Sequence, residues 1–131
     1  MNALSHDEYI RQIRADLPAA AFSLAPKKLV RMFVYLALIV SAYLAFHLTS
    51  SVLVYALLSI FIGHTLACIG FLAHELAHGA IIRARLPRYA FEYFFWALVL
   101  IPATVWKRVH NHTHHAHANT PRDPDRRFLR C

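Results

Sequence analysis

The sequence predicts an all-α membrane protein, in which a transmembrane helical hairpin is followed by an interfacial or re-entrant apolar helix and then by a cytoplasmic His-rich helix. Hydrophobic residues make up 58% of the 131 residues and charged residues 16%, whereas soluble domains contain about half and about a quarter. No Asp, Glu, Lys or Arg occurs from Met32 to Ala73. The 10 histidines gather mainly at 74–78 and 110–117. The formal net charge is +7, but the apolar excess argues against a nucleic-acid-binding protein.

The uncharged run is long enough for two membrane spans, because one spanning helix needs about 20 residues. Polarity rises at 47–51, so we expect helices at 30–48 and 52–73 that pair as antiparallel neighbours. The turn lacks Lys and Arg, whereas both outer ends are basic, with Lys27, Lys28 and Arg31 on one side and Arg83, Arg85 and Arg88 on the other. Since basic residues mark the cytoplasmic side, we expect the N-terminus and the histidine groups in the cytoplasm.

The chain divides into an N-terminal cytoplasmic or interfacial segment, 1–26, and a membrane domain, 27–131. Within the first segment, Ser5 and Glu8 fit a capping box for a short helix that Pro18 ends. This helix is expected to lie at the membrane surface.

A third apolar stretch, residues 89–106, contains Glu92 and Pro102. Its length barely allows a membrane crossing, and its many aromatic rings suit a membrane boundary. We therefore expect an interfacial or re-entrant segment. The alternative is a plain third span, which would place the two histidine groups on opposite faces of the bilayer.

The first histidine pair, His74 and His78, is spaced i, i+4, so both imidazoles lie on one face of a helix and can bind one metal ion. The same residues form a His-Glu-x-x-His pattern, which is typical of zinc proteases with Glu75 as the base. A membrane zinc metalloprotease is therefore an alternative. It needs a further ligand, usually a carboxylate from another span, and the uncharged run offers none.

The second group reads His110-Asn111-His112-Thr113-His114-His115. On an α-helix, His110 and His114 share a face and His115 is rotated by about 100° from His114, so the rings can serve two metals. His117 returns to the first face and is a further candidate, whereas His112 points away. The expected ligands are His74, His78, His110, His114 and His115. Such imidazole-rich sites suit zinc, copper, iron or nickel.

Four other residues are candidates for supporting roles. Glu75, Asp123 and Asp125 are acids close to the histidines in sequence, and carboxylates commonly orient metal-bound imidazoles. His64 lies inside the second predicted span, where an ionisable residue is a functional candidate by default. We expect it to line a substrate channel or to make a helix contact.

At these motifs the sequence resembles the integral-membrane fatty acid desaturases and their hydroxylase relatives, which carry three histidine boxes. The stretch from His74 to Gly79 matches the first box, H-x(3–4)-H, and the stretch from Trp106 to His115 matches the second, H-x(2–3)-HH. Asn119 and Asp123-Pro124-Asp125 resemble the residues that trail the second box. The third box and the spans before it are missing, so the chain is expected to be a fragment or truncated form.

The resemblance implies a membrane oxidase in which two irons activate O2 and a hydrogen is removed from a lipid acyl chain. It implies an external electron donor such as a ferredoxin or cytochrome b5, and it adds Asn119 as a metal-site candidate. The Thr-Pro-Arg-Asp-Pro run also resembles the alkane hydroxylases, so desaturation and hydroxylation both stay open. A non-catalytic metal-binding membrane protein is a further alternative.

Overall fold

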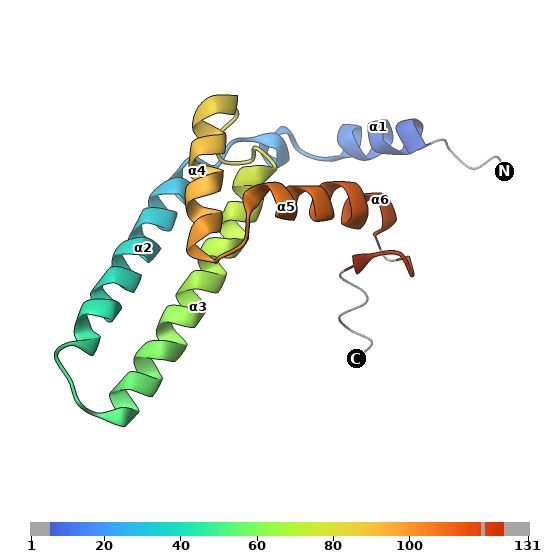
Figure 1. The fold of residues 1–131 in the computed structure, drawn as a ribbon. Coiled ribbons are helices and arrows are strands. Elements are labelled where there is room, and N and C mark those ends of the chain that lie inside the picture. Colours follow the sequence, from blue (N-terminus) through green and yellow to red (C-terminus); the bar gives the residue numbers. More distant parts are fainter. Residues whose placement is uncertain (1–5, 119, 125–131) are drawn as a thin grey trace.

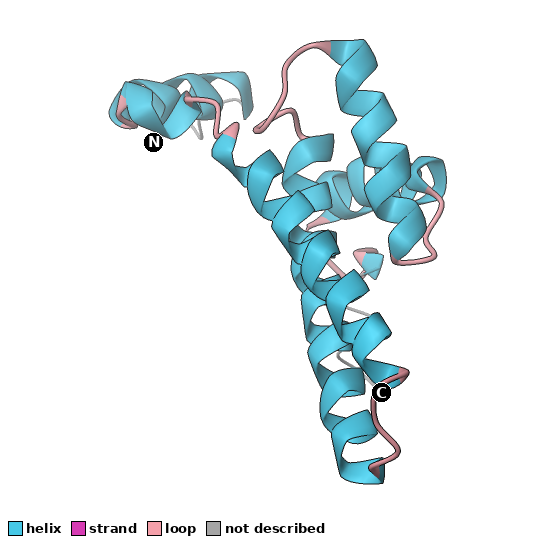
Figure 2. Cartoon of the chain, turned by 90° about the vertical axis from the view of Figure 1, so that its left-hand side faces the viewer, coloured by secondary structure: helices cyan, strands magenta, loops and turns pink. Residues whose placement is uncertain are grey.

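A computed structural model describes residues 6–118 and 120–124. Its regular elements in these residues are all helices (Figure 2), as the sequence predicts. Two long helices, α2 (Lys27–Phe46) and α3 (Val52–Ala77), lie side by side as a hairpin (Figure 1). Both are long and apolar enough to cross a membrane.

The two helices lie where the sequence predicts a helical hairpin, with shifted boundaries. The first begins and ends slightly earlier than 30–48, and the second continues past residue 73 to Ala77. His74 therefore belongs to the last turns of α3 rather than to the loop that follows. Large apolar side chains such as Val30, Leu57 and Ile60 are exposed along the hairpin. The hydrocarbon chains of lipids can surround such a surface without a free-energy cost, and the polar groups of a helical backbone are paired within the helix.

The N-terminal segment forms a short helix, α1 (His6–Asp16), and a 3₁₀ turn, η1 (Ala19–Phe22). Figure 1 shows α1 lying away from the hairpin, at the end where α2 begins and α3 ends. Pro18 separates the two elements because proline removes a backbone donor. A backbone hydrogen bond from Ala25 N–H to the Ala80 carbonyl, 3.0 Å long, ties the segment to the loop after α3.

The stretch predicted as one apolar segment at 89–106 is divided by a sharp bend. Helix α4 (Arg85–Leu98) packs against α3 and is followed by α5 (Ala103–Lys107), η2 (Arg108–His114) and α6 (His115–His117). The axis turns by 104° between α4 and the elements after it. The physical cause is local, because Leu100 has a positive φ of 58° and Pro102 follows it.

The buried core lies at the end of the hairpin that carries the histidines. It includes Met32 from α2, Leu76 from α3 and Phe95 from α4, all fully enclosed. Phe33 adds edge-to-face contacts to Phe91 and Phe95, with ring centroids 5.9 and 5.5 Å apart. The bend and this core together return the chain after α4 to the end of α3.

Candidate metal centre

The first histidine box is held by the end of α3. His74 and His78 are one turn apart, and their Nε2 atoms are separated by 3.0 Å. Gly79 follows with φ of 75°, a left-handed conformation that glycine adopts without a Cβ clash.

This glycine closes α3 with a Schellman motif. The Gly79 N–H donates to the Leu76 carbonyl at 2.9 Å, and the Ala80 N–H donates to the Glu75 carbonyl at 3.1 Å. The motif fixes the last helical turn, and so it fixes His78 relative to His74.

The second histidine box lies in a π-helix, η2, rather than in an α-helix. On an α-helix, residues five apart are about 140° away from each other. A π turn closes i→i+5 hydrogen bonds, so it brings such residues to nearly the same face. The His115 N–H accordingly bonds to the His110 carbonyl, and the two Nε2 atoms lie 3.1 Å apart.

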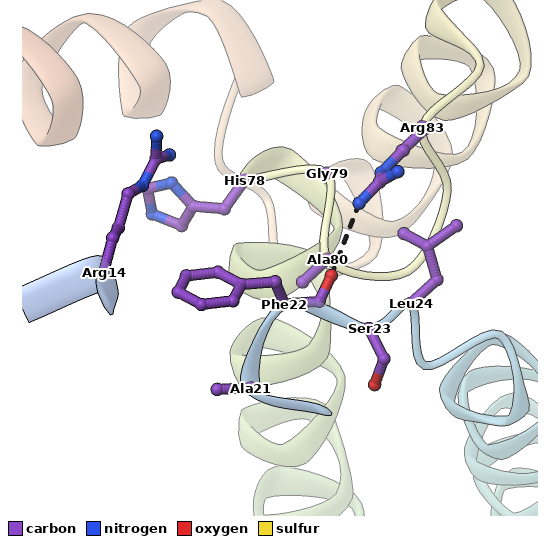
Figure 3. Close-up of a pocket in the computed structure, with 9 residues that line it drawn as sticks. All are labelled: Arg14, Ala21, Phe22, Ser23, Leu24, His78, Gly79, Ala80 and Arg83. Atoms are coloured by element: carbon purple, nitrogen blue, oxygen red, sulfur yellow. Dashed lines mark hydrogen bonds between the residues drawn. The ribbon is translucent and has the colours of Figure 1, made fainter. Parts of the chain in front are cut away.

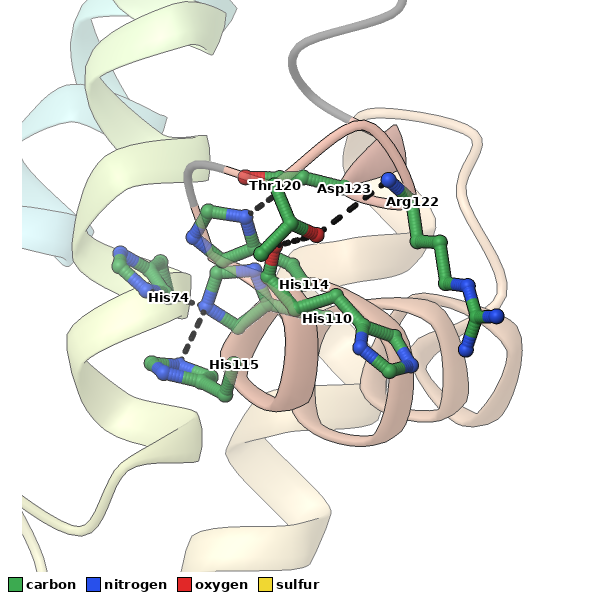
Figure 4. A network of polar contacts seen from close by, with 8 residues as sticks. His74, His110, His114, His115, Thr120, Arg122 and Asp123 are labelled. Atoms are coloured by element: carbon green, nitrogen blue, oxygen red, sulfur yellow. Dashed lines mark hydrogen bonds and ion pairs between the residues drawn. The ribbon is translucent and has the colours of Figure 1, made fainter.

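Three imidazole nitrogens, from His74, His78 and His110, lie within 4.8 Å of one another between the two boxes, and Figure 4 shows His74 and His110 with His115 beside them. The Nε2 of His110 lies 2.9 Å from that of His74 and 3.3 Å from that of His78. His115 contacts this group through His110, with the two Nε2 atoms 3.1 Å apart. Of the predicted ligands, His74, His78 and His110 are thus brought together around one point, and His115 lies next to them.

These contacts fit a cation better than hydrogen bonds between rings. A neutral imidazole nitrogen carries either one proton or one lone pair, yet the His110 Nε2 has three nitrogen neighbours within 3.3 Å. A metal about 2.1 Å from each nitrogen separates two ligands by about 3.0 Å at a right angle and by about 3.4 Å at the tetrahedral angle. The separations among His74, His78 and His110, from 2.9 to 3.3 Å, lie close to these values.

The surroundings also favour the neutral rings that a metal requires. Burial, as the largest cause, and the charges of the neighbouring imidazoles together lower the pKa of His110 to about 4. Burial, followed by the charge of His74, also lowers the pKa of His78. Both rings are therefore unprotonated at neutral pH.

An aromatic stack holds the ring of His110 in place. Trp106 stacks on His110 with ring centroids 4.3 Å apart, and on its other side it stacks on Trp96 at 4.4 Å. Trp106 also makes an edge-to-face contact with the ring of His74, with ring centroids 5.3 Å apart. Because Trp96 is part of α4 and is buried in the core, the stack fixes the His110 ring relative to α4.

His114 has a different environment from the three converging rings of His74, His78 and His110. Its Nδ1 donates to the Oδ1 of Asp123 at 2.9 Å, and Asp123 is only 3% exposed. The ring also stacks on His110, with centroids 5.0 Å apart. A carboxylate on Nδ1 fixes the tautomer with the lone pair on Nε2, as in many metal sites. The expected pairing of an acid with a histidine thus occurs between Asp123 and His114.

The other candidates lie outside this cluster or outside the described residues. The carboxylate of Glu75 forms an ion pair with Lys28 of α2. His64 is exposed in the middle of α3, with Nε2 3.7 Å from the Sγ of Cys68. His117 accepts a hydrogen bond from the Thr120 hydroxyl through its backbone carbonyl, at 2.7 Å. Asn119 and Asp125 are not among the residues that the structure describes.

A hollow of about 540 Å³ opens beside the first box (Figure 3). Figure 3 shows His78 on the side of the hollow where Arg14 lies, while Arg83 donates to the Phe22 carbonyl at 3.3 Å. The lining residues are Arg14, Ala21, Phe22, Ser23, Leu24, His78, Gly79, Ala80 and Arg83. The histidine cluster is therefore accessible from the side of the N-terminal segment.

Two supporting residues were not singled out as part of the site by sequence reasoning. In the sequence, Trp106 stands out as an aromatic residue at a membrane boundary and as the start of the second-box match, and Glu92 as an interruption of an apolar run. Glu92 is 1% exposed and pairs with Lys107 and Arg88. A single acid within an apolar segment is the signal that would have marked it, because such residues are costly without a specific partner.

A comparison with known families supports the identification that the two histidine boxes suggest. The model of the fatty acid desaturase family matches residues 50–130, which is more than half of the chain and includes both boxes. No match was found among curated proteins or among solved structures. Together with the two apolar helices, the match indicates a membrane protein. The chain belongs to the fatty acid desaturase family.

Proposed function

We propose that the chain provides part of the di-iron site of a lipid oxidase that acts on C–H bonds of acyl chains. The observation that carries the proposal is the convergence of three Nε2 atoms, from His74, His78 and His110, which belong to two separate segments of a membrane protein. Imidazole ligands suit iron, and the family match indicates oxidoreductase chemistry. We propose His74, His78 and His110 as ligands of a first iron, and His115, 3.1 Å from His110, as a further ligand of the site.

We propose His114 as a ligand of the second iron. Its Nδ1 bond to Asp123 orients the ring and leaves the lone pair on Nε2. His117, Asn119 and Asp125 stay candidates for further ligands of the second iron.

When bound, the two irons would supply the activation of dioxygen. The residues of this chain hold the ligand rings neutral, fix their orientation through Trp106 and Asp123, and place the cluster at the end of a membrane hairpin. An acyl chain can reach that position from within the bilayer, and His64 on α3 stays a candidate for its path. An external electron donor such as a ferredoxin or cytochrome b5 is proposed to supply the electrons.

We further propose that the N-terminus and both boxes face the cytoplasm. The basic residues Lys27, Lys28 and Arg31 begin α2, and Arg83, Arg85 and Arg88 follow α3, whereas residues 47–51 lack Lys and Arg. Basic flanks favour the cytoplasmic side. Labelling of a cysteine introduced at Thr120 by an impermeant reagent tests this, and labelling from the outer face alone contradicts it.

The test of the function is acyl-chain analysis of membranes that contain the protein. We expect lipids that have lost two hydrogens or gained one oxygen, and we expect His74→Ala and His110→Ala to abolish them. Unchanged products in both variants would overturn the proposal. Bound zinc with peptide cleavage would indicate the protease instead, but the ion pair of Glu75 with Lys28 disfavours Glu75 as a base. Metal binding without lipid products would indicate a non-catalytic protein.

A further inference from the structure

Glu92 is a buried carboxylate between two cations. It lies on α4 with 1% of its surface exposed, and it forms ion pairs with Lys107 of α5 and with Arg88, one turn earlier on α4. The Arg88 Nε lies 3.3 Å from Glu92 Oε1. Neither contact is aligned as a hydrogen bond, so attraction between charges holds the group. A carboxylate is costly to bury unless it is paired in this way.

The first cation belongs to the segment that carries the second histidine box. Lys107 is the last residue of α5, immediately before the π-helix that contains His110. Its neighbour Trp106 stacks on the His110 ring. The ammonium group of Lys107 also lies 4.3 Å from the centre of the Tyr89 ring on α4. Glu92 and Tyr89 together hold the start of the second box against α4.

The second cation reaches the first histidine box. A Cβ placed on Gly79 would lie 2.7 Å from the Arg88 Nη1, so the guanidinium packs directly against this glycine. Gly79 follows His78 and closes α3. One buried carboxylate is therefore linked to both halves of the histidine cluster, through Arg88 on one side and Lys107 on the other.

We propose that Glu92 is a positioning residue that sets the separation between His110 and the pair formed by His74 and His78, and thereby the metal affinity of the cluster. The inference rests on the metal site proposed above. Neutralising Glu92 leaves two cations facing each other with little solvent between them, and they are expected to move apart. Because Lys107 directly precedes the second box and Arg88 packs against Gly79 beside the first box, His110 moves away from the pair.

The experiment is a Co²⁺ titration of the purified chain in detergent micelles or nanodiscs. The visible absorption of Co²⁺ reports the number and arrangement of its ligands, so the titration yields both a Kd and a coordination signature. We expect Glu92→Gln to raise the Kd by about 10- to 100-fold, the range for residues that orient metal ligands. We also expect a changed Co²⁺ spectrum and unchanged helix content by circular dichroism.

Lys28→Met is the matched control. It also removes one partner of an ion pair near the cluster, but that pair joins α2 to α3 and has no link to the second box. We expect its Kd to stay within about twofold of that of the unchanged chain and its Co²⁺ spectrum to stay the same, since ion pairs of this exposure contribute little to stability. An equal loss in both variants would show a general structural role and would overturn the inference.

Glu92→Asp keeps the charge on a shorter side chain and covers the case in which Glu92→Gln does not fold. We expect a smaller rise in Kd than with Gln, with a partly restored Co²⁺ spectrum. If the unchanged chain binds Co²⁺ and the folded Glu92 variants bind it equally well with the same spectrum, the inference is wrong. If the unchanged chain binds no Co²⁺ through imidazole, the proposed metal site itself has failed.

Discussion

Replacing Gly79 by alanine is expected to destabilise the end of α3 by about 1–2 kcal/mol. The φ of 75° at this position is left-handed, and an L-residue there costs about 1–2 kcal/mol. The added Cβ would also lie 2.7 Å from the Arg88 Nη1, about 0.7 Å inside ordinary contact. Because that atom ends a flexible side chain, it moves aside at small cost, and the backbone dominates. Denaturant unfolding in micelles, followed by circular dichroism, measures the change.

The two other glycines provide a control of opposite sign. Gly63 and Gly70 lie within α3, and a Cβ at either one meets nothing within 4 Å. Alanine at these sites is expected to raise the unfolding free energy by about 0.5–1 kcal/mol, because glycine weakens a helix interior. A Gly79→Ala chain as stable as the unchanged protein, or stabilised like the other two, would refute the role assigned to the left-handed turn.

Three further substitutions test the site. His110→Ala is expected to weaken Co²⁺ binding by about 100-fold or more, since even residues that only orient metal ligands contribute about 10- to 100-fold. His112→Ala, which changes an exposed side chain, should keep the Co²⁺ affinity within about threefold. Equal losses of affinity for the two variants in a chelator competition would contradict this. Asp123→Asn replaces the charged acceptor of the His114 Nδ1–H by a neutral amide. The nitrogen-15 NMR signals of the His114 ring should then show a mixture of the two tautomers, and unchanged signals would argue against the hydrogen bond. Lys28→Met should lower the unfolding free energy by under about 1 kcal/mol, because the pair is about one-third exposed, and a larger loss would reveal a stronger contact.

The hairpin was predictable because its signal is local and strong. A long uncharged run with a polar break needs no tertiary information to be recognised as two spanning helices. The i, i+4 spacing of His74 and His78 likewise predicted a shared helix face, and their Nε2 atoms do lie 3.0 Å apart. Only the boundaries differ, since helix ends depend on caps such as the Gly79 motif.

The arrangement of the second box was predicted less well, because the reasoning assumed an α-helix. That geometry pairs His110 with His114 and turns His115 away. In the π-helix His115 joins His110 in the cluster, while His114 stacks on His110 and bonds to Asp123. Nothing in the spacing of the histidines distinguishes the two helix types, because a π turn is stabilised by the contacts around it.

The links between the segments were also beyond local sequence patterns. The stack through Trp106 and the ion pairs of Glu92 join residues of α4 to residues of α5, across a bend of 104°. Helical periodicity shows which residues share a face, but it does not show where the next helix will point. Leu100 and Pro102 set that direction through their backbone angles.

X-ray absorption of the chain loaded with one equivalent of Fe²⁺ tests the central claim most directly. The convergence of the Nε2 atoms predicts a first shell with three to four imidazole nitrogens at about 2.1 Å. The same measurement on His74→Ala and His110→Ala should show fewer imidazoles and a larger share of oxygen ligands. An iron shell made only of oxygen in the unchanged chain, or one that both substitutions leave unaltered, would contradict a metal centre built from these two histidine boxes.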